Sequence, residues 1–156
     1  MGKRKLGLCG FKSFGERGAW VELLFMAAAL SYGYRALKPW GDVLPYDVGI
    51  EVDGRLLRVQ VKSTTNRIGG GYKLEFIHGC KGNSRRYDAG ELDICVGYVI
   101  PQKVWYIIPA HHVTGRKGKA QITVCQFESS LNRPHFEHYR EAWDLLGKDR
   151  GELARM

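Results

Sequence analysis

Three polar residues, Asp47, Gln60 and Lys62, have types and spacing that could do chemistry. They belong to the stretch PYDVGIEVDGRLLRVQVKS, residues 45–63, in which apolar residues occupy every second place. Residues two apart in a strand point to the same face, so the polar side chains should gather opposite the apolar ones. A carboxylate beside an amide oxygen and an ammonium group can hold a cation and stabilise developing charge.

The turn in this stretch determines which residues lie opposite each other. Asp53-Gly54 is a strong signal for a two-residue type I′ turn, which needs positive φ angles at both positions. Counting outward from the turn places Asp47 directly across from Gln60, with Cβ atoms only ~5 Å apart, and Lys62 follows on the same face. The apolar face is formed by Val48, Ile50, Leu57, Val59 and Val61. The alternative is an ordinary hairpin with one core face and one hydrated face.

Glu22 adds a carboxylate in an unexpected place. It lies in the run GAWVELLFMAAAL, within a helix that the sequence predicts over residues 13–34. Because that helix is apolar nearly all round, we expect it to be largely buried, and a buried carboxylate needs a partner. Lys62, or a cation held by Asp47, would serve, and an ion pair with an arginine is the competing interpretation.

The remaining elements predict a mixed α/β or α+β fold, with residues 1–156 forming a single domain. The first helix has a capping residue at Ser13 or Gly15, and Gly33 suits its end. We expect strands over 34–38, 72–78, 94–100, 104–110 and 121–127, and a closing helix over 138–147. We expect loops over 64–71, 81–91 and 111–120, and a short hairpin connection at 101–103.

The charge of the chain favours a polyanionic partner. Lys and Arg number 24 against 16 Asp and Glu, which gives a formal net charge of +8, and nucleic acid is the commonest partner of such a protein. The N-terminus lacks a signal-peptide core, and the longest apolar run is far shorter than the ~20 residues of a membrane span. We therefore expect a cytoplasmic, nucleoid-associated protein. The cysteines are scattered without C-x-x-C pairing, which argues against zinc and disulfide frameworks.

Together these residues resemble the PD-(D/E)xK nuclease superfamily, which includes type II restriction enzymes, archaeal Holliday junction resolvases and some group I intron homing endonucleases. The resemblance covers about the first 65 residues: Gly18 to Glu22 and Gly33-Tyr34 look like the marks of the first helix, followed by Asp47 and then VQVK with Gln60 and Lys62. It implies a restriction-endonuclease-like α/β core of αβββαβ type, in which helices flank a central mixed β-sheet.

Two positions depart from the superfamily pattern. The usual Pro-Asp pair is here Pro45-Tyr46-Asp47, and Gln60 stands where Asp or Glu is usual. The intron-encoded homing branch is similar to this sequence in carrying Gln there. A Gln side chain offers a neutral oxygen ligand, so a cation should be held more weakly than by a carboxylate.

The resemblance implies an Mg²⁺-dependent DNA endonuclease in which Mn²⁺ could substitute. Asp47, Gln60, the Val61 carbonyl and Glu22 would hold the metal, and Lys62 would orient or deprotonate the attacking water. The products should carry 5′-phosphate and 3′-hydroxyl ends. Basic loop residues should contact the DNA backbone: Arg67, Lys81, Arg85, Arg86, Arg116, Lys117 and Lys119.

Three functions remain open from the sequence. The first is a homing or restriction endonuclease that acts on double-stranded DNA as a homodimer or homotetramer, since each subunit has one site. The second is a structure-selective resolvase that prefers four-way junctions. The third is a catalytically silent DNA-binding domain of the same fold.

Overall fold

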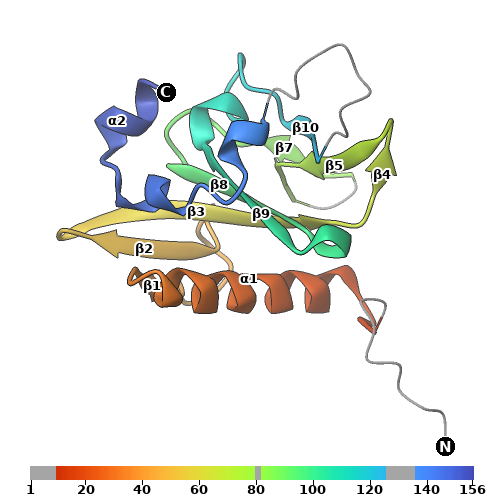
Figure 1. The fold of residues 1–156 in the computed structure, drawn as a ribbon, viewed down its shortest axis with the longest axis horizontal. Coiled ribbons are helices and arrows are strands. Elements are labelled where there is room, and N and C mark those ends of the chain that lie inside the picture. The colour runs from red at the N-terminus through yellow and green to blue at the C-terminus, as the bar shows by residue number, and fades with distance from the viewer. Residues whose placement is uncertain (1–9, 80–81, 126–135) are drawn as a thin grey trace, which may run out of the picture.

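The centre of the protein is a five-stranded mixed sheet (Figure 1). We describe it from a computed structural model that covers residues 10–79, 82–125 and 136–156. The strand order is β1 (Arg35–Leu37), β2 (Val48–Val52), β3 (Arg55–Thr64), β8 (Ile94–Val99) and β9 (Val104–Pro109). β3 and β8 run parallel and the other neighbours run antiparallel, which confirms the predicted fold class.

The hairpin has the predicted register. Val48 pairs with Val59 and Ile50 with Leu57, and Asp53 and Gly54 have φ angles of 50° and 72°, as the turn requires. β3 has 10 residues and β2 has 5, so the second half of β3 extends beyond its partner. That overhanging half carries the polar residues of interest and continues to pair with β8 on its other side.

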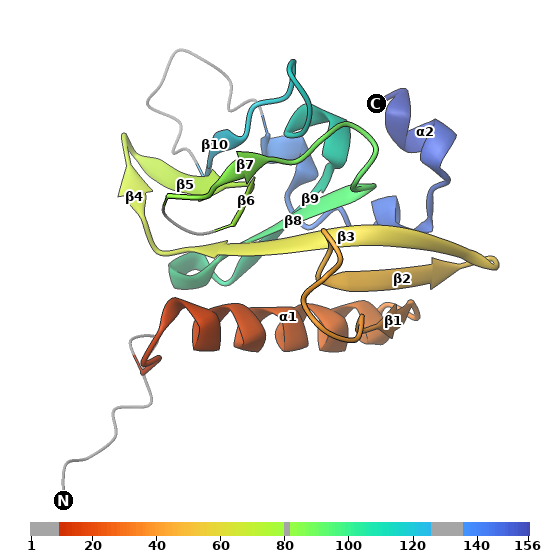
Figure 2. The same ribbon diagram turned by 180° about the vertical axis from the view of Figure 1, so that it is seen from behind.

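The first helix, α1 (Phe14–Ser31), covers one face of the sheet (Figures 1 and 2). Ser13 caps it as predicted, with its hydroxyl accepting the N–H of Glu16 at 3.1 Å. The expectation that the helix is largely buried is wrong. Its buried residues are Val21, Phe25 and Ala29, whereas Leu23 and Leu30 are 67% and 57% exposed. A helix that is apolar all round gives no sequence signal for the side that faces the core.

A small sheet covers the opposite face, in the order β10 (Gln121–Val124), β5 (Gly71–Glu75) and β4 (Arg67–Ile68). Leu74 of β5 packs against β8 at Gly97, where an added Cβ would lie 2.3 Å from the leucine side chain. The glycine therefore lets the two layers approach closely.

The connection from β3 to the parallel strand β8 consists of strands rather than a helix in its described parts, 65–79 and 82–93. The expected loop over 64–71 contains β4, and the expected loop over 81–91 contains β7 (Arg85–Arg86), which pairs with β6 (Ile77–His78). The expected strand over 72–78 is split into β5 and β6. Between them, the N–H of Phe76 donates to Ala120.

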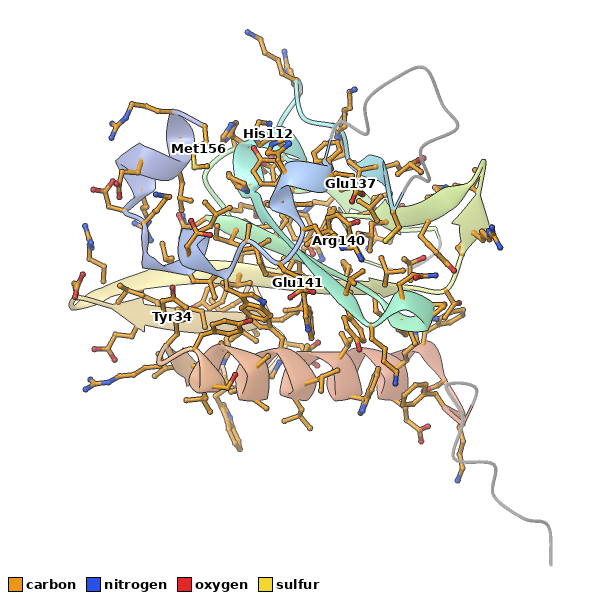
Figure 3. The ribbon with its side chains drawn as sticks, in the orientation of Figure 1. Tyr34, His112, Glu137, Arg140, Glu141 and Met156 are labelled. Atoms are coloured by element: carbon orange, nitrogen blue, oxygen red, sulfur yellow. The ribbon has the colours of Figure 1, made fainter. Side chains whose placement is uncertain are left out.

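The predicted closing helix over 138–147 is wrong. This segment forms two short 3₁₀ helices, η3 (Glu137–Tyr139) and η4 (Trp143–Gly147), and two others, η1 (Ile100–Gln102) and η2 (Ala110–His112), flank β9. Glu141 lies between η3 and η4 with φ of 51°, and its carboxylate accepts the backbone N–H of Trp105 at 2.7 Å and the indole N–H of Trp143 at 2.8 Å (Figure 3). The contact with Trp105 ties Glu141 to β9, and together with the positive φ it opposes a continuous helix.

The chain instead has a terminal helix, α2 (Arg150–Ala154), which was not predicted from the sequence. Asp149 and Glu152 form a capping box at its start, and the D-x-x-E pattern was a readable signal for it. The last part of the expected strand over 121–127 lies outside the described residues. Neither helix among the described residues has the length and apolar character that crossing a membrane demands.

Candidate active site

Asp47 and Gln60 meet where β2 begins and β3 extends past it. The N–H of Asp47 donates to the Val59 carbonyl at 2.9 Å. Its carboxylate oxygen Oδ2 accepts the N–H of Val61 at 2.9 Å and the side-chain amide of Gln60 at 2.5 Å. Because the N–H and C=O of one strand residue point to the same edge, the Val61 carbonyl faces this side as well. The structure thus brings together Asp47, Gln60 and Val61, three of the expected ligands.

Glu22 faces the same region from α1, but its partner is a lysine that the sequence analysis did not select. The Glu22 carboxylate, whose side chain is 20% exposed, forms an ion pair with Lys38. The ammonium of Lys38 also donates to the backbone carbonyl of Asp47 at 3.0 Å. Within the described parts of the chain, neither Lys62 nor an arginine forms an ion pair with Glu22. Lys38 directly follows β1, which pairs antiparallel with β2, so only that pairing would have revealed it.

A cleft of about 230 Å³ opens over these residues. The segment between β1 and β2, orange in Figure 2, loops out beside β3 and forms one wall of the cleft. Glu22, Asp47, Gln60 and Lys62 all line it, together with Lys38, His78 and Tyr87. All the predicted catalytic side chains therefore share one cavity, although they come from three separate elements.

The electrostatics of the cleft set Asp47 apart. Burial raises its pKa to about 6, and the nearby Glu22 carboxylate adds to this, whereas the Val61 hydrogen bond and the charges of Lys62 and Lys38 act in the opposite direction. A strongly perturbed carboxyl group in a cleft is typical of a functional site. A bound cation would stabilise the ionised form of such a group, because it would replace the hydration that burial removes.

The donor set fits a hard divalent cation. Two carboxylates, a side-chain amide and a backbone carbonyl provide oxygen ligands, and Mg²⁺ usually completes its octahedron with waters. Within residues 10–79, 82–125 and 136–156, no group of three His, Cys, Asp or Glu side chains is placed to hold a metal. Gln60 brings an amide oxygen rather than a third carboxylate to the cleft. Its amide nitrogen faces Asp47 here, so metal binding would require the amide oxygen to turn toward the cation.

The aromatic wall of the cleft was not predicted. His78 and Tyr87 come from the connection between β3 and β8, and their rings stack at 5.4 Å. Tyr87 is 3% exposed and belongs to the hydrophobic core. Only the fold of that connection brings His78 to the cleft, so its position could not be read from local sequence.

The basic residues expected to contact DNA differ in their surroundings. Arg67, Arg116, Lys117 and Lys119 are exposed, whereas Arg85 makes two hydrogen bonds of 2.8 Å to Glu91. That arginine lowers the pKa of Glu91 to about 2. Arg86 donates to the Gly118 carbonyl and so joins two of the three loops. Lys81 lies outside the described residues.

The fold and this cleft define a class of protein that comparison with known families confirms. The family model for PD-(D/E)XK endonucleases matches residues 14–146, so the chain belongs to this family of nucleases. Divalent metals are the usual cofactors of such nucleases.

Among solved structures, the chain is similar to a bacterial homing endonuclease, I-Ssp6803I. The two share 28% sequence identity with a TM-score of 0.75, and the match covers 92% of this chain and 99% of that chain. No curated protein matches the chain.

Proposed function

We propose that this protein is a Mg²⁺-dependent DNA endonuclease of the homing type, which hydrolyses phosphodiester bonds of double-stranded DNA. The observation that carries the proposal is the meeting of Asp47, Gln60 and Val61 at the start of β2, in one cleft with Lys62. The similarity to a homing endonuclease over nearly the whole length of both chains supports this type over a resolvase.

Asp47, Gln60 and the Val61 carbonyl would hold the cation, with Glu22 binding it directly or through water. When bound, Mg²⁺ or Mn²⁺ would polarise the scissile phosphate and lower the pKa of a water molecule. Asp47 must be ionised to bind the cation, and its raised pKa means that it is protonated more easily than an ordinary aspartate. Lys38 would release Glu22 to some extent on metal binding, because both cations compete for the same carboxylate.

Lys62 would act on the nucleophile. It lies two residues after Gln60 on the same face of β3 and lines the cleft. From that position its ammonium group would orient the attacking water and offset the charge that develops on the phosphate, or its neutral amine would take the proton of that water. The leaving group is the 3′-oxygen, so the products carry 5′-phosphate and 3′-hydroxyl ends.

The outer stripe of α1 suits a second copy of the chain. Ala19, Leu23, Ala27 and Leu30 are all exposed, at the spacing of four and three residues that helix pairs use. The stripe carries no charge in a chain of net charge +8, so DNA is not its natural partner. We propose that it forms part of a homodimer or homotetramer, which would place two active sites on one duplex.

A cleavage assay with purified protein tests the proposal. Plasmid, linear duplex and four-way junction DNA are incubated with Mg²⁺, Mn²⁺ or EDTA, beside Lys62→Ala and Asp47→Ala. We expect metal-dependent cutting of duplex DNA that both substitutions abolish. Preferential cutting of junctions would favour a resolvase instead, and tight salt-sensitive binding without cutting of any DNA would favour a silent binding domain. We also propose that residues 1–156 form a single domain. The protein would act in the cytoplasm, at the nucleoid.

A further inference from the structure

The sheet formed by β4, β5 and β10 has a polar outer face that the core does not use. Tyr72, Leu74, Ile122 and Val124 point inward and are buried. The residues between them, Lys73, Glu75, Gln121 and Thr123, therefore share the outer face. In the observed register Gln121 lies opposite Glu75 and Thr123 opposite Lys73, so these four side chains form a compact two-by-two array.

Polar contacts between neighbouring side chains link three of the four members of this array. The amide nitrogen of Gln121 donates to Glu75 at 3.1 Å, and Glu75 also forms an ion pair with Lys73. The array thus presents an amide, a carboxylate, an ammonium group and a hydroxyl at fixed spacings. A sheet needs only a hydrated outer face for stability, so the structure itself does not demand this combination.

A groove connects the array to the candidate active site. It has a volume of about 680 Å³, and its lining includes Arg17, Lys62 and Arg67 together with two members of the array, Lys73 and Glu75. Lys62 lines both this groove and the active-site cleft. Figure 1 shows β4 and β5 at the same end of the molecule as the start of α1, which carries Arg17. A polyanion seated at Lys62 would therefore extend along basic side chains toward the outer face of β5.

We propose that the outer face of β5 and β10 reads base edges in the major groove of the duplex that is cut at the active site. This inference rests on the proposed function. A two-stranded antiparallel ribbon fits the major groove. Gln binds adenine with two hydrogen bonds, Lys binds guanine, Glu accepts from the amino group of cytosine, and the Thr methyl packs on thymine. Arg17 and Arg67 line the same groove as Lys73 and Glu75 and would hold the phosphates, which fix register without reading sequence.

The experiment is selection of bound duplexes from a randomised DNA library, with Ca²⁺ in place of Mg²⁺ so that binding does not depend on cutting. Wild type is compared with Gln121→Ala, with Glu75→Gln and with Gln102→Ala. Gln102 is an exposed glutamine in η1, outside the sheet of β4, β5 and β10, and serves as the matched control. Arg67→Ala provides the phosphate-contact comparison, and thermal unfolding checks that every variant is folded.

We expect Gln121→Ala and Glu75→Gln to relax the preference at a few adjacent base pairs by roughly tenfold, while Gln102→Ala keeps the wild-type preference. Arg67→Ala should weaken binding of all sequences alike. It should also reduce the slope of the logarithm of the binding constant against the logarithm of the salt concentration by about one. Unchanged base preferences in both array variants would overturn the proposal, as would a wild type that enriches no sequence. Enrichment that shifts in the array variants, by a protein that cuts no DNA in Mg²⁺, would support the base-reading face and refute the nuclease.

Discussion

The carboxylate of Asp47 accepts the backbone N–H of Val61 at 2.9 Å, which anchors the acid to the part of β3 that extends beyond β2. An antiparallel partner residue would normally take that N–H. Because β2 begins only at Val48, the side chain of Asp47 takes it instead. The edge of β3 is thereby left open for the side chains of the cleft.

The buried Asp47 carboxylate should reduce the stability of the metal-free protein. Its pKa of about 6 lies above the ordinary aspartate value of 3.8, so the folded state binds more protons than the unfolded state between these values. Stability therefore falls as the pH rises through that window. In EDTA at pH 7.5, Asp47→Asn should increase the free energy of unfolding by up to about 3 kcal/mol, and the gain should vanish near pH 4. Urea unfolding at both pH values measures it.

An exposed acid provides the control for that measurement. Asp88 has a side chain that is 86% exposed, and Asp88→Asn should change stability by no more than about 0.5 kcal/mol at either pH. Equal stability of wild type and Asp47→Asn at pH 7.5 would contradict the account of a destabilised carboxylate.

A carboxylate in place of Gln60 should bind metal more tightly and weaken the free protein. Gln60→Glu adds a charged ligand, so half-maximal activity should require several-fold less Mg²⁺. Without metal, the second charge beside Asp47 should raise the pKa of Asp47 further and lower the melting temperature by several degrees. Thermal unfolding with EDTA and with increasing Mg²⁺ tests both effects. The melting temperatures of wild type and of Gln60→Glu, plotted against Mg²⁺ concentration, should cross. A Gln60→Glu protein whose unfolding ignores Mg²⁺ would be inconsistent with a metal site here.

Lys38 should shift the pH dependence of cleavage without taking part in the reaction itself. Its charge lowers the pKa of Asp47, so Lys38→Met should move the acid limb of the pH–rate profile to higher pH, by a few tenths of a unit to one unit. Lys38→Arg keeps the charge and should restore the wild-type profile. Global stability should change by less than about 1 kcal/mol, because the ammonium group is half exposed. Loss of cleavage at all pH values in Lys38→Met would instead indicate a catalytic role.

Introducing a charge on the outer stripe of α1 should separate the subunits. Leu23→Glu places a carboxylate on a side chain that is 67% exposed, so the fold of the subunit should survive while the proposed helix contact is lost. Size-exclusion chromatography with light scattering should show a larger assembly for wild type and a single subunit for Leu23→Glu. Met156→Glu is the control, because Met156 is 48% exposed and lies at the C-terminus, far from α1 in Figure 3. A wild type that is a single subunit at micromolar concentration would refute this contact.

The hairpin could be predicted from sequence because its information is local. One turn signal at Asp53-Gly54 and the alternation of apolar residues were sufficient to set the register, and with it the position of Asp47 opposite Gln60. The capping of α1 by Ser13 was equally local.

Features that depend on distant pairing were beyond the sequence. Lys38 reaches Glu22 only because β1 lies beside β2, and His78 reaches the cleft only through the strand-rich connection to β8. The prediction of a closing helix was wrong for a similar reason. Glu141 accepts hydrogen bonds from Trp105 and Trp143, and these contacts outweigh the helical propensity of its segment. The buried side of α1 was likewise decided by packing rather than by polarity.

The most direct test of the active site is cleavage of fragmented genomic DNA with sequencing of the new ends. Wild type, Asp47→Ala, Lys62→Ala and Gln102→Ala are each incubated with Mg²⁺ and with EDTA. The account predicts recurrent double-strand ends with 5′-phosphates in Mg²⁺ for wild type and Gln102→Ala, and at least a hundredfold fewer for the other two, as expected when a group that acts in the transition state is removed. Recurrent ends that persist in Asp47→Ala and Lys62→Ala, or that form equally well in EDTA, would contradict it.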